Sequence, residues 1–355
     1  MLKGIAPVVS VGSLSRAYQA IQPPPPKICG SPGGPPITAP RIKLRDGRHL
    51  AYKEYGMPRE KAKNKIIFVH GFSSCRHDAV IATTLSADFI EELGIHVVGF
   101  DKPGYGESDP DPKRTVKSLA LDIEELGDQL GLGSRFYIVG NSMGGQAVWG
   151  CLKYIPNRLA GAGLLAPVVN YWWPSFPADL CRDAYNQQAL RDQWTLLVAH
   201  YLPWLTYWWN TQKLCPASSV IARNPDVFSA QDLEIVKNKF SLDPEREKQQ
   251  QYATQQGVFE SLHRSLNIGF GKWEFDPMDL KNPFPNNEGA VHLWQGDDDR
   301  LVPVTLQRYI AGKLPWINYH ELPGAGHLFP HAEGMGEVIM KEFLTGETKS
   351  TSAAE

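Results

Sequence analysis

The sequence contains few cysteines and none of the patterns that would give them a structural role. Five cysteines occur in 355 residues, an odd number, and no two of them form a C-x-x-C pair. A disulfide framework and a zinc site are therefore both unexpected, and we predict free thiols, most of them buried. Nothing in the sequence implies a metal ion or another cofactor.

An excess of charge of one sign is also absent. The chain has 36 Lys and Arg against 38 Asp and Glu, a net charge of −2. Without a basic field, nucleic acid is not expected as a partner. The balance hides an asymmetry, because residues 1–45 hold six basic and no acidic residues, which leaves 30 basic against 38 acidic in the remainder. The body is acidic and the N-terminal arm is basic.

No hydrophobic run is long enough for a clear membrane span. Residues 4–21 are moderately apolar, but Pro7, Gly12 and Arg16 interrupt them within the roughly 20 residues that a span needs. Residues 22–40 contain eight prolines and three glycines, which exclude regular structure. We interpret 1–40 as a basic leader and a stiff spacer. A weak membrane association, a processed targeting peptide and an arm without a specific role all remain open, so localisation in the cytoplasm, at a membrane or in an organelle stays open too.

From residue 41 onward, short apolar runs alternate with helical patterns. The runs at 41–44 and 49–55 flank Asp46-Gly47, a turn that predicts two antiparallel strands. Further runs begin at residues 65, 96, 135, 159, 290 and 317, and each is short enough for a buried parallel strand. Leucine and isoleucine recur at helical spacing between 119 and 130, and Gly131 ends that pattern. This alternation predicts an α/β domain with a mostly parallel, doubly wound sheet.

The alternation stops between Pro167 and Ala290, a stretch with seven of the ten tryptophans. We predict an inserted, helical and aromatic-rich region over 168–284, between core segments 41–167 and 285–345. Its aromatic side chains form either a core of their own or the wall of a pocket for an apolar ligand. The candidates for that wall are Trp172, Trp173, Trp204 and Trp208. The tail, 346–355, is small and polar, which predicts disorder.

The strongest local motif is a glycine-rich pentapeptide between a predicted strand and a predicted helix. Gly140-Asn141-Ser142-Met143-Gly144 follows the run that begins at 135, and a helical segment runs from about Gly145 to Ile155. A G-x-S-x-G sequence between a strand and a helix is typical of a nucleophile elbow. The sharp turn tolerates only very small residues on either side of the nucleophile, which accounts for Gly140 and Gly144. We therefore predict Ser142 as a nucleophile.

A serine needs a base, and in this architecture the base follows the last strand. His327 does so, within a short glycine-rich segment, and His331 is the one rival. The base needs an orienting carboxylate. Three consecutive acids at 297, 298 and 299 follow the penultimate strand, and adjacency alone does not choose among them.

Two backbone N–H groups are candidates for an oxyanion hole. One belongs to Phe72, which follows His70-Gly71 at the end of the strand from 65, and the other belongs to Met143, the residue after the nucleophile. The segment 101–108 is rich in glycine after a strand, but it lacks the G-K-[ST] and G-x-G-x-x-G patterns of phosphate loops. We interpret it as a structural turn.

These motifs together resemble the α/β-hydrolase fold superfamily over residues 41–345, and most of all an uncharacterised plant branch with an N-terminal Pro-rich leader. Five motifs occur in the family's order: His70-Gly71-Phe72, the turn at 101–108, the elbow at Ser142, the G-x-x-D-x-x-V-P run at 296–303, and Gly326-His327. In the family's pattern the fourth residue of the G-x-x-D run is the triad acid, which selects Asp299. The resemblance implies a triad of Ser142, Asp299 and His327 beneath a helical cap at 168–284.

The function that the resemblance implies is a serine hydrolase that cleaves a small or medium apolar ester through an acyl-enzyme. Epoxide hydrolases and haloalkane dehalogenases share this layout but carry an aspartate nucleophile, so Ser142 disfavours both. The alternatives are a triad-dependent lyase, a C–C bond hydrolase or an acyltransferase on the same fold, and a small-molecule receptor that retains it. The sequence does not determine the oligomeric state.

Overall fold

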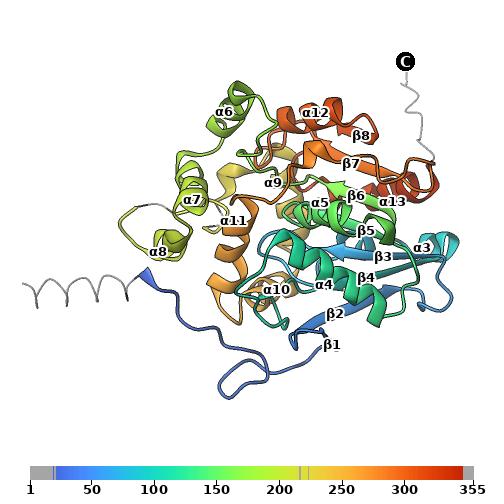
Figure 1. The fold of residues 1–355 in the computed structure, drawn as a ribbon, viewed down its shortest axis with the longest axis horizontal. Coiled ribbons are helices and arrows are strands. Elements are labelled where there is room, and N and C mark those ends of the chain that lie inside the picture. Colours follow the sequence, from blue (N-terminus) through green and yellow to red (C-terminus); the bar gives the residue numbers. More distant parts are fainter. Residues whose placement is uncertain (1–18, 20, 216, 223, 347–355) are drawn as a thin grey trace, which may run out of the picture.

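The computed structural model describes residue 19 and residues 21–346, apart from 216 and 223 (Figure 1). Most of the predicted basic leader and all but the first residue of the predicted tail lie outside these residues. All five cysteines lie inside them as free thiols; Cys29, Cys75 and Cys151 are buried, and Cys215 is exposed.

The core of the described chain is one sheet of eight strands in the order β1-β2-β4-β3-β5-β6-β7-β8 (Figure 1). The first two pairs in this order are antiparallel and all later pairs are parallel. The α/β fold with a mostly parallel sheet is therefore confirmed. The strands are β1 (Arg41–Lys43), β2 (His49–Gly56), β3 (Asn64–Val69), β4 (Ile95–Phe100), β5 (Phe136–Asn141), β6 (Leu159–Leu165), β7 (Val291–Gly296) and β8 (Ile317–Leu322).

Burial along the strands explains their composition. Every residue of β4 and β7 is buried, because helices cover both faces of the parallel part of the sheet. β8, at the edge, is buried only at Ile317 and half-buried or exposed beyond it. At the other edge, Gly47 turns the β1–β2 hairpin with a φ of +92°, a conformation that glycine adopts without steric cost.

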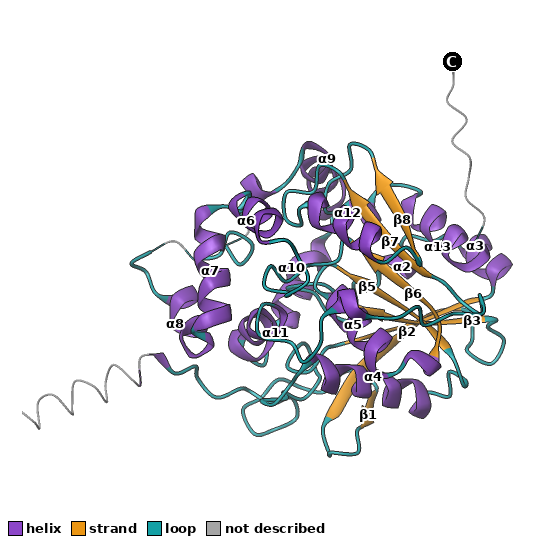
Figure 2. Cartoon of the chain, turned by 45° about the horizontal axis from the view of Figure 1, so that its top comes forward, coloured by secondary structure: helices purple, strands orange, loops and turns teal. Residues whose placement is uncertain are grey.

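Helices pack on both faces of the sheet (Figure 2). One face is covered by apolar residues of α4 (Val116–Gln129), α5 (Gly144–Tyr154) and α12 (Val304–Lys313). The other face is covered by α2 (Val80–Thr83), α3 (Ala87–Leu93) and α13 (Met335–Thr345). The apolar spacing between 119 and 130 is the buried stripe of α4, and this helix ends where predicted, just before Gly131.

The region between β6 and β7 is helical in the part that the structure describes and holds no strand there. Its helices lie beside one end of the sheet (Figure 1). They are α6 (Ala178–Asn186), α7 (Leu190–Tyr201), α8 (Thr206–Thr211), α9 (Ala230–Ile235), α10 (Pro244–Ala253) and α11 (Arg264–Gly269), with short 3₁₀ or π turns between them. We call residues 168–284 the cap. Across the described residues, none of the helices combines the length and the apolar character that crossing a membrane requires.

The predicted spacer has no helix or strand after residue 22, but it is fixed to the folded body. The backbone N–H of Cys29 donates to the Gln256 side chain of the cap at 3.0 Å. The N–H groups of Thr38 and Ala39 both donate to Glu107 Oε2, at 2.8 and 2.9 Å. The proline-rich segment therefore connects the cap to the glycine-rich turn at 101–108.

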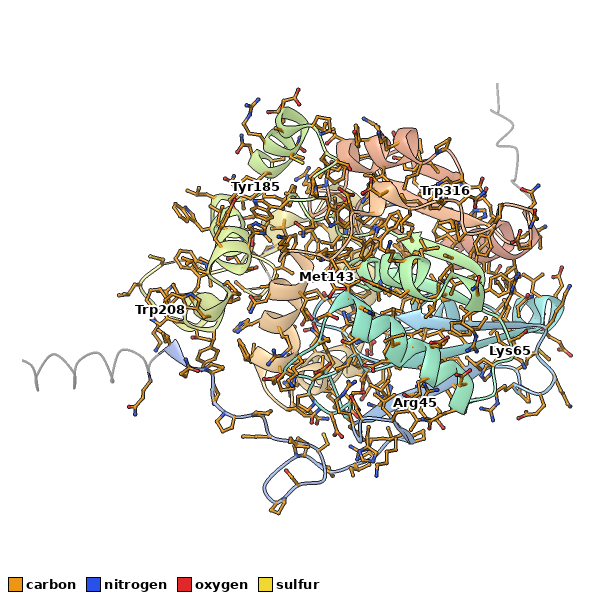
Figure 3. The ribbon with its side chains drawn as sticks, in the orientation of Figure 1. Arg45, Lys65, Met143, Tyr185, Trp208 and Trp316 are labelled. Carbon is orange, nitrogen blue, oxygen red and sulfur yellow. The ribbon has the colours of Figure 1, made fainter. Side chains whose placement is uncertain are left out.

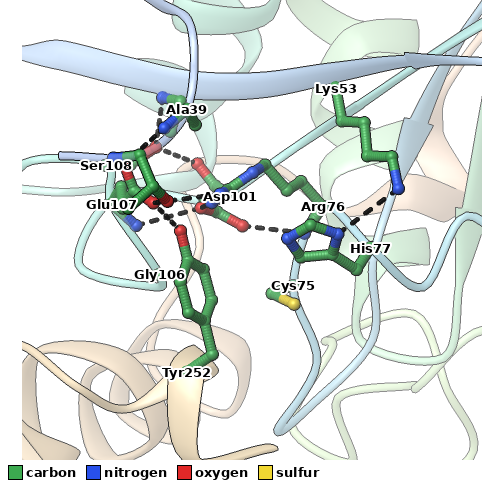
Figure 4. A network of polar contacts seen from close by, with 12 residues as sticks. Ala39, Lys53, Cys75, Arg76, His77, Asp101, Gly106, Glu107, Ser108 and Tyr252 are labelled. Atoms are coloured by element: carbon green, nitrogen blue, oxygen red, sulfur yellow. Dashed lines mark hydrogen bonds and ion pairs between the residues drawn. The ribbon is translucent and has the colours of Figure 1, made fainter. Parts of the chain in front are cut away.

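Glu107 belongs to a buried ion network that ties three parts of the chain together (Figure 4). The Arg76 guanidinium donates to Asp101 Oδ2 at 2.5 Å and to Glu107 Oε1 at 3.0 Å. The ring of Tyr252, from cap helix α10, lies 4.6 Å from the Arg76 guanidinium carbon, and its hydroxyl donates to Glu107. The turn at 101–108 therefore has a structural role, since two of its residues bind Arg76 and one binds the cap residue Tyr252. This agrees with its lack of a phosphate-binding pattern.

Candidate active site

The sharp turn at Ser142 connects β5 to α5 at the carboxyl end of the sheet. Ser142 has a φ of +54°, in the left-handed region that non-glycine residues seldom occupy. A side chain on Gly140 would collide with the Gly144 carbonyl, and one on Gly144 would collide with the Val69 carbonyl. The two glycines are therefore required by the close approach of β5, β3 and α5, and the turn lifts the Ser142 hydroxyl out of the sheet.

The structure brings Ser142, His327 and Asp299 together from three separate loops. His327 Nε2 lies 3.0 Å from Ser142 Oγ, and His327 Nδ1 lies 2.8 Å from Asp299 Oδ2. His331, the one rival for the base, packs instead with its ring edge-on to Phe240 at 4.9 Å. Geometry of this kind allows a proton to pass from the hydroxyl to the imidazole.

Asp299 is distinguished from its two neighbours by its hydrogen bonds. Its Oδ1 accepts the N–H groups of Leu301 and Val302, both at 2.9 Å, and its Oδ2 accepts Gln295 Nε2 at 2.9 Å besides the histidine. Asp297 instead accepts the N–H of Gly324, and Asp298 pairs with Arg300 at the surface. Asp299 is therefore held rigidly with both oxygens occupied, and it alone of the three faces His327.

The electrostatic environment of His327 favours its protonated form. Burial of the ring disfavours the charge, but the carboxylate of Asp299, through its charge and hydrogen bond, outweighs burial, and Asp232 adds to it. The pKa of His327 consequently lies above the ordinary value. His331 shows the opposite balance, because burial lowers its pKa to about 4.

Asp232 is a site residue that the sequence analysis missed. This buried carboxylate of α9 accepts the N–H of His327 at 3.0 Å through Oδ2 and that of Leu328 at 2.7 Å through Oδ1. Ser229 caps the same helix, and its pairing with Asp232 three residues later is a visible capping signal. That signal predicts a helix start but not a long-range partner. Through Asp232 the cap fixes the loop that carries the histidine.

The two residues whose N–H groups are predicted to form an oxyanion hole line the same cavity as Ser142 and His327. Phe72 and Met143 both line it. In the part of the chain that the structure describes, neither N–H has a hydrogen-bond acceptor. Unpaired N–H groups beside a nucleophile can bind a negatively charged oxygen.

The cavity lies between the sheet and the cap, where Figure 3 places Met143. Its volume is about 720 Å³ with its opening to solvent included. Most of its lining is apolar and comes from the loop after β6 and from the cap, with a few polar groups from α7 and the segment before it. The apolar residues include Val168, Tyr171, Leu196, Leu266 and Phe270, and the polar ones include Gln188, Asp192 and Thr195.

The prediction that tryptophans line the cavity is wrong for all four candidates. Trp173 is buried in the main core, 5.0 Å from the ring of Trp273. Trp172 stacks on His200 at 4.1 Å. Trp204 is 57% exposed, and Trp208 lies on α8, far from Met143 (Figure 3). Among the described aromatic residues of the cap, Tyr171 and Phe270 line the cavity instead.

A serine on a strand–helix elbow, with a histidine and an aspartate from later loops of a mostly parallel sheet, defines the α/β hydrolases. Residues 66–340 match the model of the Alpha/beta hydrolase family. The chain therefore belongs to this family, as the motifs suggested.

Comparisons with individual proteins agree with this placement. The chain is 23% identical over 283 residues to the probable lysophospholipase BODYGUARD 2 of Arabidopsis thaliana, covering 76% of this chain and 55% of that one. It is 22% identical over 288 residues to the uncharacterized hydrolase YugF of Bacillus subtilis (strain 168), covering 80% of this chain and 90% of that one. Its fold is similar to the solved structure of a thermophilic esterase from Thermogutta terrifontis, with a TM-score of 0.56, 20% identity and coverage of 86% and 97%. The chain spans about half the length of the plant relative. These findings support hydrolase activity in general.

Proposed function

We propose that the chain is a serine esterase that hydrolyses a carboxylic ester with Ser142 as the nucleophile. The observation that carries the proposal is the continuous pair of hydrogen bonds from Ser142 through His327 to Asp299 at a mostly apolar cavity. Similarity to proteins named as an esterase and as a probable lysophospholipase supports it.

In the proposed mechanism, Ser142 Oγ attacks the ester carbonyl carbon while His327 Nε2 takes the hydroxyl proton. The carbonyl π electrons move to oxygen, and the N–H groups of Phe72 and Met143 donate to that oxyanion. Collapse of the intermediate expels the alcohol, which takes the proton from His327, and leaves an acyl-enzyme. Water then attacks the acyl group by the same steps and releases the acid.

Asp299 has two tasks in this mechanism. As the acceptor of His327 Nδ1–H, it leaves Nε2 free to receive the serine proton, and it stabilises the imidazolium that forms. Its remaining hydrogen bonds, to two backbone N–H groups and Gln295, keep it in place during turnover.

The proposed substrate is an ester with a small or medium apolar group. Valine, leucine and aromatic side chains make up most of the cavity wall, and such a wall binds apolar groups by removing their surface from water. The cavity is bounded by the cap, which limits the length of chain that it accepts.

A fluorophosphonate probe tests the proposal directly, since it reacts with activated serines. The purified protein should be labelled, the Ser142→Ala variant should not, and p-nitrophenyl esters of graded acyl length should compete. The acyl length of the best competitor indicates how long an acyl chain the cavity accepts. Folded wild-type protein that stays unlabelled, and that hydrolyses none of these esters, would exclude the proposed activity.

The rate of ester hydrolysis should fall at acidic pH, with a midpoint above the ordinary histidine value of about 6.5. His327 accepts a proton only when it is neutral, and its pKa is raised because the charge and hydrogen bond of Asp299 outweigh burial. Activity is therefore complete above that raised pKa and is lost as the pH falls through it. The measurement is kcat/KM as a function of pH.

The control for this profile is Asp299→Asn. Removing the carboxylate charge lowers the pKa of His327, so the midpoint of the residual activity should move to lower pH. A wild-type midpoint at or below the ordinary value, or one that does not move in the variant, would contradict the assignment of His327 as the base.

A further inference from the structure

The peptide bond between Gly71 and Phe72 lies directly against the nucleophile. A Cβ atom on Gly71 would come within 3.3 Å of Ser142 Cβ, and Phe72 lines the cavity. In a trans peptide the N–H and the C=O point in opposite directions. An N–H of Phe72 that faces the cavity therefore requires a Gly71 carbonyl that faces the protein interior.

Two buried side chains donate to that interior carbonyl. Lys102 Nζ lies 3.3 Å from the Gly71 oxygen, and His70 Nδ1 lies 2.9 Å from it. The backbone N–H of Lys102 donates to His70 Nε2 at 3.1 Å, so the ring proton of His70 must be on Nδ1. His70 and Lys102 thus hold the same carbonyl from two sides.

Lys102 is an unusual residue to find in this position. It is only 4% exposed, and its ammonium lies 4.9 Å from the centroid of the Tyr105 ring. No carboxylate lies within ion-pair distance among the described residues, and burial, followed by the nearby Arg114 charge, lowers the pKa of Lys102 well below its usual value. A buried, unpaired lysine is costly for stability, and such groups are enriched at functional sites.

We propose that Lys102 is a positioning residue that orients and polarises the Gly71–Phe72 peptide, so that the Phe72 N–H is held ready to bind the oxyanion. A donor to the carbonyl draws electron density toward oxygen and makes the N–H of the same peptide a stronger donor. Lys102 acts only through this peptide and does not touch the substrate. The inference rests on the proposed esterase function.

The test is Lys102→Met, which removes the donor and keeps an unbranched apolar stem. With p-nitrophenyl butyrate, kcat should fall by about 10-fold or more. This loss should be smaller than the roughly 10²–10³-fold loss seen when an oxyanion donor itself is removed. KM should stay nearly constant, because the ground-state ester does not need the oxyanion donor. The Ki of a trifluoromethyl ketone, which binds serine as a tetrahedral oxyanion, should rise by the same factor as kcat falls.

The melting temperature separates this role from a structural one. Lys102→Met should melt at or above the wild-type temperature, because it removes an unpaired buried charge while His70 still satisfies the carbonyl. The matched control is Lys65→Met, at the end of β3 opposite to His70 and Gly71. This variant should change neither kcat nor Ki.

Three results would overturn the inference. The first is a Lys102→Met variant with unchanged kcat and unchanged Ki for the ketone. The second is a loss of kcat with an unchanged Ki, and the third is a loss of kcat that accompanies a lower melting temperature. Either loss would show damage that does not concern the oxyanion. A wild-type protein without esterase activity would overturn the proposed function and this inference together, whereas an active wild type with an unaffected variant would overturn the inference alone.

Discussion

Replacement of Ser142 by alanine is expected to lower kcat for ester hydrolysis by roughly 10⁶-fold, the scale of loss when a triad serine is removed. In the proposed mechanism Ser142 Oγ is the atom that forms the acyl-enzyme, so what remains in the variant is the small contribution of the oxyanion donors and of binding. The fold should be unaffected, because His327 is the one hydrogen-bond partner of Ser142 Oγ among the described residues and the backbone bond from the Ser142 N–H to Leu165 is retained.

Binding should distinguish loss of chemistry from loss of the site. A non-hydrolysable amide analogue of the best ester should bind Ser142→Ala and wild type with similar affinity in calorimetry, since the apolar cavity wall is the same in both. Ser134→Ala, on an exposed loop before β5, is the matched control and should have wild-type activity. Substantial hydrolysis by purified Ser142→Ala would mean that another group is the nucleophile.

The second large effect concerns stability. Arg76→Met is expected to reduce the free energy of unfolding by about 3–5 kcal/mol, the cost of leaving a buried charge without its partner. Arg76 is the cation that Asp101 and Glu107 share, and all three side chains are almost completely buried. Burial raises the pKa of Asp101, and Arg76 opposes that rise, so the variant must either bury the two carboxylates without a counter-ion or protonate them. The measurement is the midpoint of denaturant unfolding.

Two further variants make this prediction specific. Arg182→Met removes an arginine from a pair in which both side chains are about two-thirds exposed, and such pairs contribute little, so its midpoint should stay close to wild type. Adding Asp101→Asn and Glu107→Gln to Arg76→Met should restore part of the lost stability, because no charge then remains unpaired. An Arg76→Met protein as stable as wild type would show that the network does not hold the cap and the N-terminal segment to the core.

The ion network also holds the N-terminal segment in place against the folded body. Glu107 accepts hydrogen bonds from Thr38 and Ala39 as well as from Arg76 and the cap residue Tyr252. On the histidine loop, the Gly326 N–H donates to Gln231 and the His327 N–H donates to Asp232, so these hydrogen bonds too join segments far apart in sequence. The cap, the core and the spacer are therefore coupled at Glu107, and the cap and the core are coupled again at the histidine loop.

The sheet and the elbow are predictable from the sequence, because both depend on local patterns. Short apolar runs that alternate with helical patterns predict parallel strands buried on both faces, and Gly140 and Gly144 indicate a turn in which no larger residue fits. Ser142 and His327 follow from the same local logic, since each occupies the end of a strand where the architecture places it. The aspartate was chosen among three by resemblance alone.

Tertiary structure decided the features that depend on distant contacts. Asp299 is distinguished from Asp297 and Asp298 by His327, which follows 28 residues later and places its Nδ1 2.8 Å from Asp299 Oδ2. Asp232 and Lys102 look like ordinary charged residues until the fold buries them against His327 and Gly71. The cap tryptophans were misplaced for the same reason: composition shows that they must be packed, but only the arrangement of the helices decides which rings pair with one another and which face the cavity.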